Sequence, residues 1–510
     1  MSLDTRSPVL TLAIVGTGAM GRGIAQIAAQ AGIAVLLYDA QPGAAGKARE
    51  DIIVTLNRLA DKGKISRQAL ADASDRLKPT LHLEQLASAQ VLIEAIVENL
   101  AAKQQLFRQM EAIISPQCIL ATNTSSLSVT AIAAACRHPE RVGGFHFFNP
   151  VPLMKIVEVI DGLLTAPWVG ETLLALGRRI GHTAVRARDT PGFIVNHAGR
   201  GFVTEALRCL GEGIAEHHEI DRIMRDAAGF RMGPFELLDL TGLDVSQPVM
   251  ESIYHQYYEE PRYRPSPLAA QRLAGGMLGR KSGRGFYSYS DGQAQPIAAP
   301  PAPAARPKQV WVSQAQPEWH KKVCALVQQL GGDIDAGQRP AADALCIVTP
   351  LGSDATSLCL TQGLDASRTV AIDCLFGLEQ GGARRTLMTT PLTSPEMRAA
   401  AHGLFAADGV PVSVIRDSAG LVAQRIVAAI VNIGCDIAQQ RIAAPADIDR
   451  AVSLGLGYPK GPLTLGDTIG ASNILAILEA MQSFYGDPRY RPSPWLKRRA
   501  LLGVSLLTEE

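Results

Sequence analysis

The chain has 510 residues, of which 47% are hydrophobic and 19% are charged; this is the composition of a packed globular protein, not of a disordered or fibrous one. Its 49 basic and 48 acidic residues leave a formal net charge of +1, so no overall field favours nucleic acid or an anionic membrane as a partner. The chain is too long to fold around a single hydrophobic core, and roughly three or four domains are expected.

The sequence carries no pattern typical of export, membrane insertion or a bound metal. Residues 1–8 lack an apolar export region. The longest apolar stretch, residues 421–438, is interrupted by polar side chains, which a membrane span would tolerate only at high cost. The eight cysteines form no C-x-x-C pair and no metal-ligand spacing. We therefore expect a cytoplasmic protein with reduced thiols, a buried helix at 421–438 and no metal.

The first third of the chain has the pattern of an α/β domain. Short β-branched runs alternate with helical patterns from Leu10 to Ile160, as in βαβ units that build a parallel sheet with helices on both faces. The predicted strands are residues 12–15, 35–38, 91–95, 119–121, 143–147 and 156–159. After Arg188 the apolar residues recur at helical spacing, which predicts a mostly helical domain to about Tyr289.

A glycine-rich loop follows the first predicted strand and opens an apolar helix. In this loop Gly16 would permit a tight turn, Gly18 would let the backbone approach a pyrophosphate, and Gly21 would allow close packing of helix on strand. Asp39 ends the second strand, where a carboxylate accepts hydrogen bonds from ribose hydroxyls and repels a 2′-phosphate. We predict NAD as the cofactor; a plain glycine turn and a capping aspartate are the alternative. The expected cofactor residues here are Gly16, Gly18, Ala19, Met20, Gly21 and Asp39.

Four polar residues form the candidate catalytic group. His146 ends an apolar strand in VGGFHFFNP, at the carboxyl side of the sheet, where doubly wound folds bind ligands. Ser125 lies in TNTSSL, Glu158 in KIVEVI and Asn196 in DTPGFIVN. Each of the four also has a purely structural alternative. His146 could be a core histidine and Ser125 a helix cap. Glu158 could be an exposed strand residue, and Asn196 a core amide with its hydrogen bonds satisfied.

Together with GRKSGRGFY at residues 279–287, these strings resemble the 3-hydroxyacyl-CoA dehydrogenase family across residues 10–289. The resemblance implies NAD-dependent oxidation of an (S)-3-hydroxyacyl-CoA to the 3-ketoacyl-CoA, as in fatty acid β-oxidation. His146 would accept the hydroxyl proton, Glu158 would hold the other ring nitrogen and stabilise the imidazolium, and Ser125 and Asn196 would hydrogen-bond the reacting oxygen.

The resemblance also suggests less specific contacts, each of which could equally be a solvated surface residue. Positions similar to the family's NAD contacts are Glu98, Lys103, Ser125, Asn149 and Lys281. Thr55, Arg58 and Lys62 lie on one face of a predicted helix, where they could hold the phosphates of CoA.

The second half of the chain is a degenerate repeat. Adding 228 carries Asp189 onto Asp417 and Asp239 onto Asp467, while Asn196 falls on Gln424. Strands are expected near residues 345–349, 369–373 and 412–415, with no glycine-rich loop. We expect that this copy has lost its chemistry. The partial repeat resembles the longer bacterial members of the family, including the 3-hydroxyadipyl-CoA dehydrogenases of phenylacetate breakdown.

The expected fold class is therefore α/β plus all-α, in five segments. They are a Rossmann-like NAD-binding domain (1–188), a helical substrate or dimerisation domain (189–292), a Pro/Ala-rich linker (293–309), a truncated α/β domain (310–416) and a second helical copy (417–510). We expect the helical copies to pack about a pseudo-twofold axis, which makes the protein a monomer with an internal pseudo-dimer, or a homodimer. The expected partner is an acyl-CoA substrate. A dehydrogenase of a free 3-hydroxy acid, a 3-hydroxybutyryl-CoA dehydrogenase and a non-enzymatic NAD-binding protein remain as alternatives.

Overall fold

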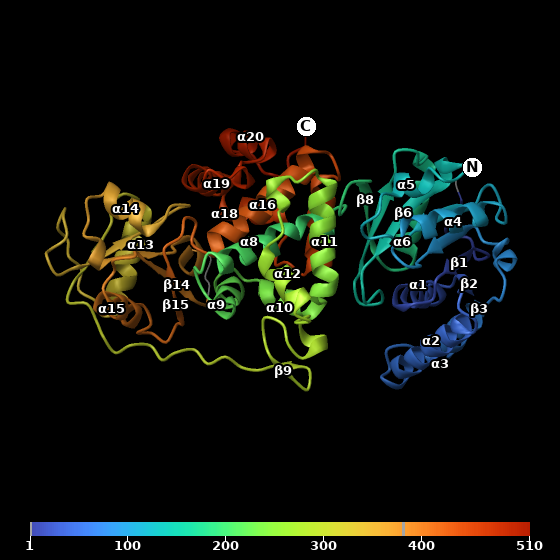
Figure 1. Ribbon diagram of the computed structural model, residues 1–510, viewed down its shortest axis with the longest axis horizontal. Helices are drawn as coiled ribbons and strands as arrows, with labels where there is room; N and C mark the ends of the chain where they lie inside the picture. The colour runs from blue at the N-terminus through green and yellow to red at the C-terminus, as the bar shows by residue number, and fades with distance from the viewer. Residues whose placement is uncertain (1–2, 380–382, 510) are drawn as a thin grey trace. The chain divides into compact units, whose positions relative to one another are not determined.

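The computed structural model describes residues 3–379 and 383–509, coloured from blue to red along the chain in Figure 1. Residues 1–2, 380–382 and 510, which fall in the predicted segments 1–188, 310–416 and 417–510, lie outside the described residues. The chain divides into two compact units, Met1–His197 with Gln440–Leu456, and Ala198–Gln439 with Gly457–Glu510.

The first unit is built on an eight-stranded sheet in the order β3-β2-β1-β4-β5-β6-β7-β8. The strands are β1 (Thr11–Val15), β2 (Ala34–Tyr38), β3 (Leu77–Pro79), β4 (Val91–Glu94), β5 (Ile119–Thr122), β6 (Val142–Phe147), β7 (Ile156–Asp161) and β8 (Thr183–Arg188). Neighbours are parallel except β6 and β7. The sheet is therefore dominated by parallel pairs, as expected, although β7 and β8 run opposite to the other six strands.

Helices cover both faces of this sheet. They are α1 (Ala19–Gln30), α2 (Ala44–Asp61), α3 (Arg67–Arg76), α4 (Leu100–Glu111), α5 (Val129–Ala133), α6 (Pro167–Arg179), α7 (Val195–Ala198) and α17 (Pro445–Leu456). Alternate residues of β1 enter two separate hydrophobic clusters: Leu12 and Ile14 join side chains of α1, α2 and α6, whereas Ala13 and Val15 join those of α4 and α5. The strands are thus buried on both sides, as their apolar runs predict.

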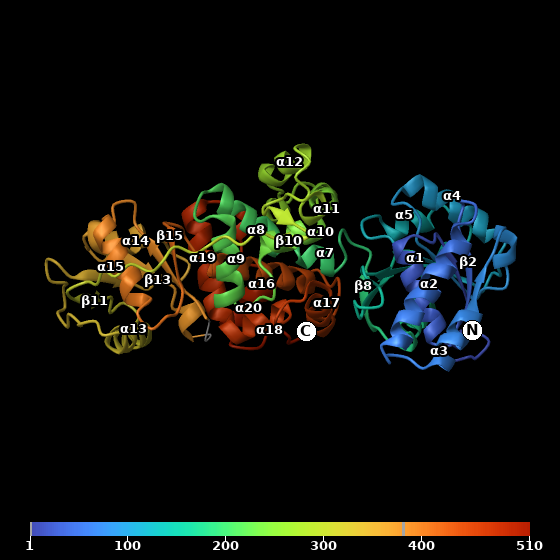
Figure 2. The same ribbon diagram turned by 90° about the horizontal axis from the view of Figure 1, so that it is seen from below.

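One helix of the first unit comes from the second copy of the repeat. α17 contacts β7 and β8; α17 and β8 are labelled in Figure 2. The N–H of Arg188 donates to the carbonyl of Ile442 at 2.8 Å. Within the second unit the N–H of Arg416 donates to the carbonyl of Ile214 at 3.0 Å. Arg416 is the equivalent of Arg188, and Ile442 is the equivalent of Ile214, each 228 residues later in the chain. Each copy therefore donates the same hydrogen bond to the other.

The second unit contains most of both helical copies and a second sheet. The helices are α8 (Arg200–Gly211), α9 (His217–Arg222), the π-helix η3 (Ile223–Ala227), α10 (Pro234–Thr241), α11 (Leu243–Gln256), α12 (Pro267–Ala274), α13 (Pro317–Gln329), α14 (Ala355–Thr361), α15 (Pro395–Phe405), α16 (Ala423–Gln439), α18 (Pro462–Ile469), α19 (Ala471–Tyr485) and α20 (Pro494–Leu502). A small hairpin pairs β9 (Tyr289–Ser290) with β10 (Gln293–Ala294). Across the described residues, no helix combines the length and hydropathy that crossing a bilayer requires.

The second sheet repeats five of the eight strands of the first. Its strands are β11 (Val310–Val312), β12 (Leu345–Val348), β13 (Thr369–Ile372), β14 (Arg385–Thr389) and β15 (Val412–Arg416), in that order across the sheet. Only β13 and β14 pair antiparallel, so order and direction match β4 to β8. In the part of the chain that the structure describes, this sheet has no strands that match β1 to β3, and with them the glycine-rich loop is missing. The predicted fold class, with a partial repeat of both halves, is confirmed.

The two helical copies pack on each other through α8 and α16, the latter lying where a buried helix is predicted. Gly201 lies so close to α16 that an added Cβ would be 2.8 Å from the Cα of Ile430. Beside this contact Arg425, fully buried, donates to Glu205 and Glu212. Burial alone would raise the pKa of Glu205, but Arg425 and Arg489 outweigh it and hold that pKa below its usual value. An ionised cluster therefore lies inside the interface.

Removing Arg425 should be costly, because Glu205 would remain charged and buried. We expect R425M to destabilise the second unit by about 3–5 kcal/mol, the usual cost of breaking a buried ion pair from one side. The measurement is the midpoint of urea unfolding. The control is K497M, since Lys497 pairs with Glu479 at the surface and such pairs contribute about 0–1 kcal/mol. Equal midpoints for both variants would contradict the expectation.

Candidate functional site

The glycine-rich loop joins β1 to α1 and needs glycine for two different reasons. Gly16 has a φ of +93°, and a Cβ added there would lie 2.5 Å from the carbonyl oxygen of Ala95. A Cβ on Gly21 would lie 1.8 Å from the carbonyl oxygen of Gly16. At Gly18, in contrast, nothing lies within 4 Å of an added Cβ. The loop is thus tightly packed on its inner side and open at Gly18.

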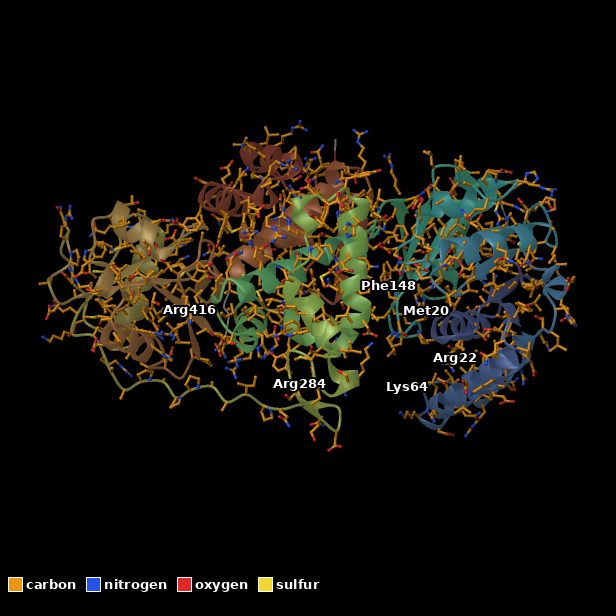
Figure 3. All side chains as sticks on the ribbon, viewed as in Figure 1. Met20, Arg22, Lys64, Phe148, Arg284 and Arg416 are labelled. Carbon is orange, nitrogen blue, oxygen red and sulfur yellow. The ribbon has the colours of Figure 1, made fainter. Side chains whose placement is uncertain are left out.

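The open side of the loop leads into the first turn of α1. Ala19 is the first residue of this helix, and Gly18, its N-cap, provides no side chain to bond the first N–H groups. Met20 and Arg22 follow on α1, as labelled in Figure 3. Free N–H groups and the positive end of the helix dipole at this point suit a phosphate group.

Asp39 follows β2 and holds the loop from its side. Its Oδ2 accepts hydrogen bonds from the N–H and the hydroxyl of Thr17 at 2.7 and 2.8 Å, and its Oδ1 accepts from the N–H of Gln41 at 3.0 Å. Burial alone would raise the pKa of Asp39, but these bonds outweigh it and hold the pKa below its usual value. The ionised carboxylate lines a cleft of about 470 Å³ together with Gly18, Arg22 and Lys47.

His146 and Glu158 face each other across the antiparallel pair β6 and β7. They are directly opposite in the register, so both side chains lie on the same face of the sheet. Nδ1 of His146 lies 2.7 Å from Oε2 of Glu158, and the two side chains are 5% and 0% exposed. Because a carboxylate accepts, Nδ1 carries the proton, which leaves the lone pair on Nε2. The pair can therefore act as a general base through Nε2.

The second oxygen of Glu158 is held by the backbone that enters α7. Oε1 accepts hydrogen bonds from the N–H groups of Ile194 and Val195, both at 2.9 Å. The imidazole packs against two aromatic rings, with centroids 4.4 Å from Phe148 and 5.8 Å from Phe193. The dyad is fixed by hydrogen bonds on one side and by apolar contacts on the other.

Ser125 and Asn196 lie together next to this backbone. The side-chain amide of Asn196 donates to the carbonyl of Ser125 at 3.5 Å. The Ser125 loop is held by Glu98, whose Oε1 accepts from the hydroxyl of Thr124 at 2.6 Å and from the N–H groups of Ser125 and Ser126 at 2.9 and 3.0 Å. Glu98, whose side chain is 35% exposed, is therefore a surface residue that also organises the loop.

Lys103, in contrast, is buried and cannot be a surface residue. Its Nζ lies 2.5 Å from Glu94 and 3.3 Å from Glu98, and its side chain is 1% exposed. Oε2 of Glu94 also accepts from the hydroxyl of Thr122 at 2.7 Å. The sequence analysis does not identify Glu94, although a carboxylate at the end of the apolar run VLIE is a signal for a buried partner.

The remaining predicted residues are exposed. Asn149 is exposed just after β6. Lys281 belongs to the second unit and pairs with Asp244 at 2.5 Å. Thr55 and Arg58 are exposed on α2, and Lys62 is exposed at its C-cap, so all three are available to solvent.

The equivalent position in the second sheet has lost the dyad. The N–H of Asp373 donates to the carbonyl of Thr386 at 3.0 Å, which places these residues opposite each other on the strands that match β6 and β7. Oδ1 of Asp373 accepts from the side-chain amide of Gln424 at 3.0 Å. Burial raises the pKa of Asp373 to about 6. An aspartate thus stands in place of His146 and a threonine in place of Glu158.

Comparison with known proteins covers nearly the whole chain. Residues 11–190 match the family model of the 3-hydroxyacyl-CoA dehydrogenase NAD binding domain, and residues 192–289 and 420–505 both match the model of the C-terminal domain. The chain is 38% identical to the 3-hydroxyadipyl-CoA dehydrogenase of Escherichia coli (strain K12), over 97% of this chain and 98% of that protein.

Two solved structures are also similar. The crystal structure of 3-hydroxybutyryl-CoA dehydrogenase from Escherichia coli K12 has a TM-score of 0.84 and 37% identity, over 97% of this chain and 98% of that one. The (S)-3-hydroxybutyryl-CoA dehydrogenase from Ralstonia eutropha has a TM-score of 0.54 and 38% identity, over 56% of this chain and 100% of that one. That shorter relative therefore corresponds to one copy of the repeat.

Proposed function

Because the chain belongs to the 3-hydroxyacyl-CoA dehydrogenase family, we propose that it oxidises an (S)-3-hydroxyacyl-CoA to the 3-ketoacyl-CoA with His146 as general base. The enzyme is an NAD-dependent oxidoreductase. The observation that supports the assignment of the base is the buried bond between Nδ1 of His146 and Glu158, which leaves the lone pair on Nε2.

The proposed chemistry is a proton transfer coupled to loss of hydride from carbon. Nε2 of His146 takes the proton of the 3-hydroxyl, and the carboxylate of Glu158 stabilises the imidazolium that forms. NAD, when bound, accepts the hydride from C3. Without the base, positive charge would develop on that carbon. Ser125 and Asn196 hydrogen-bond the reacting oxygen and orient C3, so little further ordering is needed.

The proposed cofactor contacts follow from the loop geometry. Gly18, Ala19 and Met20 at the first turn of α1 would hold the pyrophosphate of NAD, and Asp39 would accept hydrogen bonds from the ribose hydroxyls. Glu98 contributes by holding the Ser125 loop, and Lys103 by holding Glu98. The proposed contacts of Asn149 and Lys281 with NAD rest on the family resemblance alone.

For the substrate we propose 3-hydroxyadipyl-CoA, as in phenylacetate breakdown. The support is a relative of that name that matches both copies of the repeat; a structure that matches equally far carries the name 3-hydroxybutyryl-CoA dehydrogenase, which is the alternative. Thr55, Arg58 and Lys62 are proposed to meet the phosphates of CoA. The eight cysteines are free thiols, which supports a cytoplasmic enzyme.

Replacing His146 should abolish most of the activity. We expect H146A to lower kcat by about 10²- to 10⁴-fold, the usual contribution of a positioned base, with NAD affinity and folding nearly unchanged. The measurement is steady-state formation of NADH together with NAD binding by calorimetry. H138A is the control, because His138 is exposed at the surface. If H146A keeps wild-type kcat, the base is assigned wrongly.

The preference for NAD over NADP should depend on Asp39. We expect D39S to lower the ratio of kcat/KM for NAD to that for NADP by roughly 10- to 100-fold, because it removes charged hydrogen bonds and the repulsion of a 2′-phosphate. D61S, at an exposed aspartate paired with Arg67, is the control and should keep the wild-type ratio. An unchanged ratio in D39S would remove Asp39 from the cofactor site.

Substrate identity can be decided by comparing thioesters and free acids. We expect kcat/KM to be roughly tenfold or more higher for 3-hydroxyadipyl-CoA than for 3-hydroxybutyryl-CoA or a medium-chain analogue, and no rate with the free 3-hydroxy acids. The readout is NADH absorbance under identical conditions. A higher value for 3-hydroxybutyryl-CoA would favour that substrate, and equal rates for acid and thioester would contradict an acyl-CoA substrate.

A further inference from the structure

A strained turn, residues 190–195, holds the carboxylate of Glu158. Within it Gly192 and Phe193 have φ values of +78° and +48°, and a left-handed conformation is unfavourable for a bulky residue such as phenylalanine. The turn ends at Ile194 and Val195, whose N–H groups bond Glu158. Such strain persists only where the surroundings hold it, so the packing around Val195 matters for the dyad.

The element that packs on Val195 is α17, from the repeat that has no dyad of its own. Gly455 lies on this helix, and a Cβ added to it would be 2.8 and 2.9 Å from Cγ1 and Cγ2 of Val195. Real Cβ atoms essentially never approach so closely. Because valine is branched at Cβ and strongly prefers one χ1 rotamer in a helix, turning its methyl groups away is costly. The missing side chain at Gly455 therefore sets where Val195 can lie.

The reciprocal contact in the degenerate copy shows what this pair is adapted to. There Gly420 and Leu421 repeat the turn, with φ values of +81° and +48°. Ala423 stands where the first copy has Val195, and Ala227 stands where the second has Gly455, each 228 residues apart. Their elements, α16 and η3, are also in contact. The equivalent positions hold glycine and valine beside the dyad, and two alanines where the dyad is absent.

On the basis of the proposed function, we infer that Gly455 is a positioning residue for the reaction. The bare backbone of α17 at Gly455 lets Val195 fill the space beside it, which places the N–H of Val195 on Oε1 of Glu158. Glu158 in turn orients His146. The second copy thus completes the catalytic site of the first, although it has no dyad of its own.

The test is G455A, which adds one methyl group against Val195. An exchange of glycine for alanine within a helix normally favours the helix, so a loss of activity would not come from α17 itself. We expect kcat to fall about tenfold or more, as misplacement of a catalytic group does, with the KM for NAD nearly unchanged. Amide hydrogen exchange in residues 190–197 should become faster.

The decisive variant is the double exchange G455A/V195A, which copies the alanine pair of the second copy. In the first copy the added Cβ at position 455 would lie 3.5 Å from the Cβ at position 195, an ordinary contact. We therefore expect the double variant to restore kcat and slow amide exchange, although V195A alone, which leaves a gap, should lower kcat and quicken exchange. G211A is the control, because an added Cβ at the end of α8 meets only Leu268 at 3.5 Å.

The outcomes separate this inference from the proposed function. Full activity and unchanged amide exchange in G455A would overturn this inference. A loss of activity in G455A that remains in the double variant G455A/V195A would also overturn it. If G455A does not fold, the double variant and V195A decide in the same way. Amide exchange reports on the turn whether or not His146 is the base, so an active H146A would contradict the proposed function alone.

Discussion

A carboxylate buried as completely as that of Glu158 is stable only when its oxygens receive hydrogen bonds, because desolvation of an unpaired charge costs several kcal/mol. One oxygen meets Nδ1 of His146, and the other meets two backbone N–H groups of the turn that enters α7. This requirement links three parts of the fold: the antiparallel strands β6 and β7, the strained turn after β8, and the helix packed behind that turn. Each must be in place for the imidazole to present Nε2.

The reversal of strand direction at β7 is the step that makes the dyad possible. In a parallel pair, no residue exchanges both of its backbone hydrogen bonds with one residue directly across. In an antiparallel pair, two residues in register lie directly opposite each other, and their side chains meet on the same face of the sheet. The second sheet keeps this reversal between β13 and β14. It therefore retains the frame of the site after losing the imidazole, the carboxylate and the strands that carry the glycine-rich loop.

How far the sequence predicts this structure depends on the range of the interactions. The glycine-rich loop and Asp39 are predictable because the turn and its contacts are local, and the geometry of Gly16 and Gly21 agrees with the roles expected for them. The four polar residues can be named, but the opposition of His146 and Glu158 depends on a strand direction that periodicity does not encode. Strands β3, β8, β11 and β14 are not predicted, since two have three residues and two carry arginine.

The burial of Lys103 and the position of α17 lie further from what the sequence can indicate. Lys103 has the pattern of a surface helix residue, and only the fold places Glu94 and Glu98 around it. The 228-residue repeat is visible in the sequence, but the exchange of α17 onto the first sheet is a long-range contact that no local pattern specifies.

That exchange has a consequence for how the enzyme behaves at low concentration. Two separate chains that each contribute a helix to the other dissociate on dilution, because their association depends on protein concentration. Here α17 and the turn it supports belong to one polypeptide, so their encounter is governed by tethering, at an effective concentration that does not change with the amount of protein. The support that α17 gives to this turn is then independent of protein concentration.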